Sequence, residues 1–358
     1  MRYPGARRPE RAWDIVSYYQ STELAGEACQ RLSGREPNSQ LKRSIASHVS
    51  QGMQYLSAAS GAEDLTRPLL IYYGTLALGR SLILLTGGAS SEAALKQSHG
   101  LQNVAWESAI AQDEFLALQL KVVDGTFSDV AKLTGALHKA WVKDDEGGAS
   151  LMSFPQEQIP DHFSLGNILE RLPGLSASFP KLAGTPTRTH ESLLRRRPPE
   201  NLIVWVPNEE MPGPGEQRDW SKAFFGSRLG ALDIGNPHVG QNDPDLAEGG
   251  FVRGELWAEY REAARRLGYA ETHDDMAYLV EPLPGRVWLS PIAKLMAAAY
   301  AFGMLARYYP TAWTAIARGP SASPIGPLAS LALREIENEF PRQWVRLVVD
   351  PWRGWSAT

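Results

Sequence analysis

Arg80 lies near the middle of the most apolar stretch of the chain, "PLLIYYGTLALGRSLILL" at residues 68–85. An arginine there could hold an anionic ligand in a pocket between helices, joined by Tyr72 or Tyr73. Tyr73 stands seven positions before Arg80, so a helix places both on one face, two turns apart. The same arginine could instead be a core charge that is paired with a carboxylate or extends its head to water. The sequence leaves both alternatives open.

His99 is the next side chain with candidate chemistry, in "LKQSHGLQ" just after the apolar stretch. A histidine followed by a glycine in a loop can present its ring to a ligand or hydrogen-bond the end of a helix. We therefore group His99 with Tyr72, Tyr73 and Arg80 as a candidate ligand-binding set. A purely structural role for the loop histidine is the alternative.

Acidic residues and histidines occur together late in the chain without a metal-binding motif. A metal site needs several converging ligands, and the chain has no HxH, HExxH or CxxC pattern. The side chains that could contribute are His238, Asp243, Asp245, His273, Asp274 and Asp275. We expect no metal. Glycine-rich phosphate loops and a G-x-S-x-G elbow are also absent, so we expect no cofactor.

The composition excludes several classes of protein. The 358 residues carry a formal net charge of −4, so no basic nucleic-acid-binding domain is indicated. The single cysteine, Cys29, rules out an internal disulfide and fits a reducing compartment. No secretory signal is visible at the N-terminus, and no run of 18 apolar residues lacks a charge. We expect a cytoplasmic protein that does not contact a membrane.

Helical periodicity runs through both ends of the chain. Pro68 suits the first turn of a helix and the glycines of "TGG" suit its end. The expected helices cover 11–33, about 39–60, 68–86 and 290–313, and one or two more helices are expected over 326–350.

The middle of the chain has shorter and more mixed patterns. Alternating apolar residues predict strands over 114–125 and 201–207, and "PLPG" predicts the turn of a hairpin over 276–291. We expect short helices at 163–175 and 219–230, and a loop over 231–250.

These elements predict a mainly α (α+β) fold. Helices from the two ends of the chain form a bundle, because each end carries more apolar surface than it can bury alone. The expected parts are an N-terminal helical bundle at 1–110, a mixed α/β region at 111–289, and C-terminal helices at 290–358 that pack on the bundle.

Several segments, in order along nearly the whole chain, resemble the YaaC-like protein family. They are "WDIVSYYQSTELA", "RPLLIYYGTLALGRSLIL", "SHGL", "FSLGNILERLPGL" and "MLARYYPTAW". Because that family is largely uncharacterised, the resemblance implies architecture more than chemistry.

Residues 39–101 also resemble a helical bundle of the HEPN type, with a helix containing "YYG" followed by an "HGL" loop. HEPN ribonucleases cleave RNA without a metal, using an arginine and a histidine close together on a late helix. The resemblance implies that His48 could orient the 2′-OH and Arg43 could stabilise the phosphorane charge. Here, however, this R-x4-H pair lies on an early helix. HEPN-like bundles without the motif often act as binding or dimerisation modules and are common in antiviral systems.

The leading hypothesis is a non-catalytic helical binding or assembly subunit with its pocket at Tyr72, Tyr73, Arg80 and His99. A prokaryotic antiviral defence system is the setting that this hypothesis suggests. One alternative is a HEPN-type ribonuclease that uses Arg43 and His48. Another is an enzyme that acts on a small anionic molecule at Arg80. The expected partner is another protein subunit or a second copy of the chain, with RNA as a further candidate.

Overall fold

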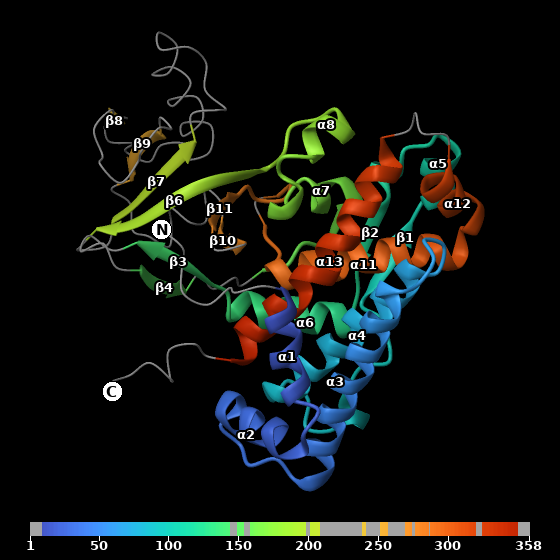
Figure 1. The fold of residues 1–358 in the computed structure, drawn as a ribbon, viewed down its shortest axis with the longest axis vertical. Coiled ribbons are helices and arrows are strands. Elements are labelled where there is room, and N and C mark those ends of the chain that lie inside the picture. Colours follow the sequence, from blue (N-terminus) through green and yellow to red (C-terminus); the bar gives the residue numbers. More distant parts are fainter. Residues whose placement is uncertain are drawn as a thin grey trace.

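The computed structural model describes residues 9–143, 149–153, 158–197, 201–207, 238–240, 251–256, 269–273, 276–285, 287–319 and 324–349. Helices from both ends of the chain form its core, and short, mostly antiparallel strands from the middle lie beside them (Figure 1). The expected mainly α (α+β) fold is confirmed. The predicted domain boundaries stay a prediction.

The N-terminal part consists of four helices: α1 (Pro9–Tyr18), α2 (Thr22–Ser33), α3 (Ser39–Ser60) and α4 (Arg67–Leu85). The prediction of one helix over 11–33 is wrong, because the chain turns after α1 and starts again. Ser21 caps α2, and its hydroxyl accepts a hydrogen bond from the Leu24 amide.

The expected bounds of α3 and α4 are confirmed. Asn38 caps α3 by accepting a hydrogen bond from the Leu41 amide at 2.8 Å, and proline lies in the first turn of α4. The two helices approach closely, because a Cβ at Gly52 would lie 2.6 Å from a side-chain atom of Leu78.

The C-terminal part consists of α11 (Pro291–Tyr308), α12 (Pro310–Arg318) and α13 (Ile325–Val348). The helix expected over 290–313 is broken at Pro310, since proline cannot donate a backbone hydrogen bond to the preceding turn. Of the one or two helices predicted over 326–350, the structure has one, α13, with Pro341 inside it.

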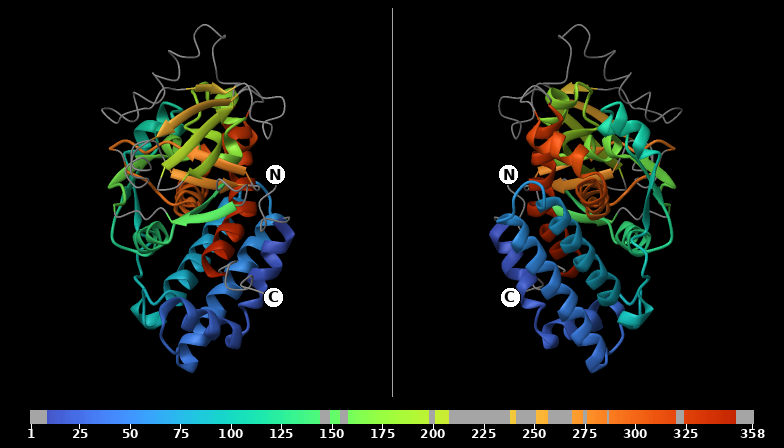
Figure 2. Two further views of the ribbon diagram at one scale, coloured as in Figure 1. Left: turned by 90° about the vertical axis from the view of Figure 1, so that its left-hand side faces the viewer. Right: turned by 90° about the vertical axis from the view of Figure 1, so that its right-hand side faces the viewer.

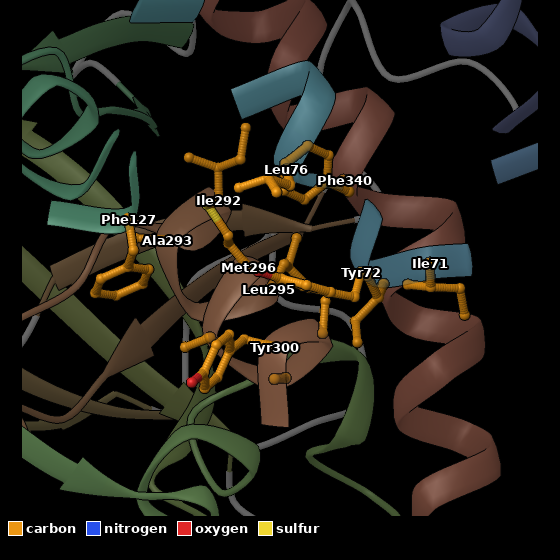
Figure 3. Packing of buried hydrophobic residues seen from close by; sticks show 14 of the residues in the cluster. Ile71, Tyr72, Leu76, Phe127, Ile292, Ala293, Leu295, Met296, Tyr300 and Phe340 are labelled. Atoms are coloured by element: carbon orange, nitrogen blue, oxygen red, sulfur yellow. The ribbon is translucent and has the colours of Figure 1, made fainter. Parts of the chain in front are cut away.

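Helix α11 is the centre of the core. Every residue from Pro291 to Leu305 is buried, and α11 packs against α4, α6, α7, α12 and α13. Figure 3 shows Tyr72 and Leu76 of α4 beside Met296 and Tyr300 of α11. The prediction that the helices of the two ends pack together is therefore confirmed.

The apolar composition of α4 follows from this position. Among the described residues, it is the one helix long and apolar enough to cross a membrane, yet 78% of its apolar window is buried inside the fold. Burial in the core explains its hydrophobicity.

A small antiparallel sheet lies near one end of α11 and is formed by β1 (Leu101–Val104), β2 (Gln119–Val122) and β5 (His162–Ser164) in the order β1-β2-β5. The strand predicted over 114–125 is shorter than expected, because residues Phe115–Ala117 form a 3-10 turn.

Short helices surround this sheet and connect it to the core. They are α5 (Trp106–Ala111), α6 (Thr126–Ala136), α7 (Leu165–Leu169) and α8 (Phe179–Ala183), with 3-10 turns at Glu92–Ala94 and Pro173–Leu175.

The larger sheet contains β10 (Tyr269–His273), β11 (Met276–Val280), β6 (Thr189–Arg197), β7 (Asn201–Pro207), β9 (Phe251–Leu256) and β8 (His238–Gly240) in that order. In addition, β3 (Lys139–Lys143) pairs with β4 (Ala149–Ser153) and with β6. Figure 2 shows this sheet at the opposite end of the molecule from α2.

The strand predicted at 201–207 is confirmed as β7. Of the hairpin predicted over 276–291, the turn is confirmed, since Leu283 and Val287 form an antiparallel bridge around it. The strand before it is not part of a hairpin, because β11 pairs with β10 and β6. The helix predicted at 219–230 lies outside the described residues. So does the loop predicted at 231–250, except for β8.

Candidate functional site

Arg80 is half-buried on α4 and has no acidic partner. Among the described residues it forms no ion pair, and its Nε reaches the Thr126 hydroxyl at 3.5 Å, the upper limit for a hydrogen bond. A half-buried guanidinium without a carboxylate is unusual, because the desolvation of a charge is normally offset by a partner. The described contacts therefore do not supply the paired core charge that was one alternative for Arg80.

Tyr72 is the most buried member of the predicted set. It is 1% exposed, and its hydroxyl has no hydrogen-bond partner. Its ring makes edge contacts with His99 and with Tyr300 of α11, both with centroids 5.6 Å apart. Burial raises the pKa of Tyr72, and the charge of Arg80 opposes that shift. The phenol is therefore a neutral donor that points to no acceptor.

Two histidines near Arg80 also have buried nitrogens without hydrogen-bond partners. These atoms are Nδ1 of His99, in the loop after α4, and Nε2 of His48, on α3. Burial lowers the pKa of both imidazoles, and the charge of Arg80 lowers both further. Glu92 lies 3.7 Å from His48 Nε2 and partly opposes the shift of that histidine.

The charge of Arg80 thus acts on three polar side chains, each of which has a buried atom without a hydrogen bond. We call Arg80, His48, Tyr72 and His99 the Arg80 site. Helices α3 and α4 and the loop after α4 position the site. From α11, the Tyr300 ring contacts Tyr72 and His99, and its hydroxyl donates a hydrogen bond to the Leu101 carbonyl at 3.0 Å. Of the predicted ligand-binding residues, Tyr72, Arg80 and His99 belong to it.

Tyr73, the fourth predicted residue, lies on the half-exposed side of α4. Its hydroxyl accepts a hydrogen bond from Arg307 of α11 at 3.1 Å, and its ring contacts that of Tyr72 at 5.4 Å. The Arg307 guanidinium also lies over the Tyr308 ring, 4.9 Å from its centroid. We call Tyr73, Arg307 and Tyr308 the rim.

The structure does not bring Arg43 and His48 together. Five positions along a helix correspond to a rotation of roughly 140° beyond one full turn. Arg43 is exposed accordingly, while His48 is buried. The charged groups that act on His48 are instead Glu92 and Arg80.

Sequence reasoning missed Tyr300 and Arg307. Both lie more than 200 positions from α4 in the chain. No local signal connects them to Arg80, and only the packing of α11 on α4 places them there. The expectation that the terminal helices meet could have directed attention to polar residues on α11.

A second cluster of buried charges lies where α11 and α13 meet the larger sheet. Lys294 of α11 contacts Glu271 of β10 at 2.6 Å, and its Nζ donates to the Arg171 carbonyl at 2.6 Å. His273 of β10 lies 2.9 Å from Glu335 of α13. We call these five residues the interface ion network.

The charges of this network compensate one another. Burial raises the pKa of Glu271 and lowers that of Lys294, while their mutual contact opposes both shifts. Arg171 forms an ion pair with Glu170 and donates to the Glu281 carbonyl at 2.9 Å. The network therefore joins helices to the sheet through paired charges, although Glu335 Oε1 forms no hydrogen bond.

No group of three or more histidine, cysteine, aspartate or glutamate side chains in the described part of the chain is placed to hold a metal ion. Of the residues considered for a metal, Asp243, Asp245, Asp274 and Asp275 lie outside the described residues.

Two cavities lie away from the Arg80 site. One of about 260 Å³ opens between α12, α13 and the start of α4, beside Arg67 and Trp313. A groove of about 810 Å³ follows β5, beside Phe163 and Val287. Neither contains Arg80 or His99 in its lining.

A helical core with a mixed middle section and an unpaired cationic site defines this protein as a mainly helical α+β protein. It belongs to the YaaC-like family: the family model, described as YaaC-like Protein, matches residues 17–347. No curated protein and no solved structure matches the chain.

Proposed function

We propose that this protein is a binding protein that takes an anionic ligand at the Arg80 site. One observation carries the proposal: Arg80 has no carboxylate partner among the described residues, while polar atoms of His48, Tyr72 and His99 nearby are buried without hydrogen bonds. Leaving each such atom unsatisfied costs about 1–3 kcal/mol. An anion that accepts from Tyr72 and Arg80 removes much of that cost.

The charges near the site favour an anion. Arg80 and Arg307 both act on Tyr72 and His99, and their charges lower the pKa of His99. The carboxylate nearest to the site is that of Glu92, which is exposed. A bound anion favours the protonated forms of the histidines, so its affinity is expected to rise as the pH falls.

Sulfate tests the proposal, because its charge is constant over the relevant pH range. Wild-type protein is expected to show a thermal stabilisation that grows with sulfate concentration. Arg80→Gln is expected to lose this stabilisation, and Arg43→Gln, which changes an exposed arginine on α3, is expected to keep it. Equal responses of all three proteins would contradict the proposal.

Ribonuclease activity stays a second candidate because the charge of Arg80, which pairs with no carboxylate among the described residues, acts on His48. The test is incubation with total RNA in the presence of a chelator. Cleavage by wild type that is lost in Arg80→Ala but kept in Arg43→Ala would assign the activity to the Arg80–His48 pair. Loss in Arg43→Ala with retention in Arg80→Ala would assign it to the R-x4-H pair. An antiviral role and a protein partner remain predictions.

A further inference from the structure

The rim extends the Arg80 site toward solvent with a second guanidinium and an accessible ring. Arg307 is exposed at the end of α11, where its side chain bridges the Tyr73 hydroxyl and the face of the Tyr308 ring. Tyr308 itself is 58% exposed. The ring is therefore available to a flat group from solvent, next to a fixed positive charge.

The rim and the Arg80 site are continuous. The ring of Tyr73 contacts that of Tyr72. The backbone of α11 is held close to the same side chain, because a Cβ at Gly303 would lie 2.7 Å from the Cβ of Tyr72. The charge of Arg307 also reaches His99 and Tyr72. One ligand can therefore contact both groups of residues.

The spacing of Tyr73 and Arg80 along α4 indicates the length of that ligand. Tyr73, which holds Arg307, and Arg80 lie seven residues apart on one face of α4, a rise of about 10 Å along the helix. A single small anion cannot span this separation. An extended molecule with a phosphate at one end and a flat ring at the other can.

We infer that the ligand of the Arg80 site is a nucleoside polyphosphate, with its terminal phosphate at Arg80 and its base on Tyr308 beside Arg307. This inference rests on the proposed function. Aromatic rings stack on bases of any sequence, and guanidinium groups bind phosphate and stack on flat rings. The site uses side chains of helices for this purpose, since the glycine-rich phosphate loops are absent from the sequence.

The same chemistry occurs in a free nucleotide and at the triphosphorylated end of a single-stranded RNA. Titration calorimetry on the full chain distinguishes the sources. The probes are the common ribonucleoside triphosphates, inorganic tripolyphosphate, and a 5′-triphosphorylated single-stranded RNA of about ten nucleotides. We expect the nucleotides to bind at least about fivefold more tightly than tripolyphosphate, because only they can stack. Tighter binding of the RNA than of any free nucleotide would assign the site to a strand end and would support the same chemistry.

Variants separate this inference from the proposed function. Tyr308→Ala is expected to reduce nucleotide affinity to that of tripolyphosphate, while Tyr308→Phe keeps it. Tyr18→Ala is the matched control, since Tyr18 is 57% exposed on α1. If tripolyphosphate binds as tightly as the nucleotides, and Arg80→Gln abolishes both, the ligand class is wrong and the anion site stands. If neither binds and sulfate has no effect, the proposed function fails as well.

Discussion

The Arg80 site and the interface ion network treat buried charge in opposite ways. In the network, Lys294 and Glu271 satisfy each other at 2.6 Å, and His273 has Glu335 as its neighbour. In the Arg80 site, no carboxylate among the described residues pairs with the guanidinium. Polar atoms of Tyr72 and His99 form no hydrogen bond, and His48 has only the exposed Glu92 at 3.7 Å. The same helix, α11, contributes to both regions.

This difference separates structural charge from charge that is available for binding. A buried ion pair contributes little net stability, but removing one member leaves the other uncompensated. An unpaired guanidinium carries its desolvation cost in the absence of ligand, and a bound anion reduces that cost. The network is therefore expected to matter for folding, and the Arg80 site for ligand binding.

The largest effect is expected for Lys294→Met. It removes the partner of Glu271, which is 3% exposed, and leaves a buried carboxylate. We expect a loss of about 3–5 kcal/mol in the free energy of unfolding, measured with urea. The double variant Lys294→Met/Glu271→Met is expected to recover most of this loss. If the single variant is as stable as wild type, the ion pair of Lys294 and Glu271 does not stabilise the fold.

A smaller loss is expected for Gly303→Ala, which tests how tightly α11 holds Tyr72. The added methyl group would lie 2.7 Å from the Tyr72 Cβ, so the helices must separate slightly. We expect a cost of about 1–3 kcal/mol, read from urea unfolding. Gly61→Ala is the control, because a Cβ at that position meets no atom within 4 Å. If the two variants are equally stable, α4 and α11 accommodate the added methyl group without a loss of packing.

The pH dependence of stability is expected to reveal the two histidines of the Arg80 site. Their pKa lies below the ordinary value of 6.5 in the folded protein. As the pH falls below 6.5, the unfolded chain takes up protons that the folded protein does not, so the free energy of unfolding decreases.

Below pH 6.5, the free energy of unfolding of the double variant His48→Gln/His99→Gln is expected to fall less steeply with pH than that of wild type. Chemical unfolding at a series of pH values measures the difference. Saturating sulfate is expected to reduce the wild-type slope, since a bound anion raises the pKa of both groups. Parallel curves for the two proteins would mean that these histidines do not contribute to the pH dependence of stability, and would contradict their place in the Arg80 site.

The smallest effect on stability is expected for Arg80→Gln. Because no carboxylate among the described residues is left unpaired, the free energy of unfolding is expected to change by less than about 1 kcal/mol. Urea unfolding of Arg80→Gln beside Lys294→Met compares the two regions directly. A loss for Arg80→Gln as large as that for Lys294→Met would mean that Arg80 is structural.

Local patterns predicted the elements with strong periodicity and clear ends. Helices α3 and α4 have the expected bounds, because Asn38 and Pro68 mark their starts and apolar residues recur along them. The spacing of Tyr73 and Arg80 correctly placed both on α4. The break between α1 and α2 was missed, since the cap at Ser21 interrupts an otherwise helical pattern.

Local sequence patterns could not predict which strands and helices that are distant in the chain lie side by side. Strand β11 was predicted to fold back on the segment after it, but it pairs with β10 and β6. The contribution of Tyr300 and Arg307 to the candidate site likewise depends on how α11 packs against α4. Arg43 and His48 were paired by spacing alone, and the rotation of α3 separates an exposed side chain from a buried one.

Helix α11 is enclosed by the helices that pack around it and connects two regions of the molecule. It is 18 residues long, which corresponds to about 27 Å, and it is enclosed by other helices over nearly all of its length. Lys294 lies near one end and Arg307 near the other. Because Arg307 contacts Tyr73 and Lys294 contacts Glu271 of β10, this one helix connects the rim with the larger sheet.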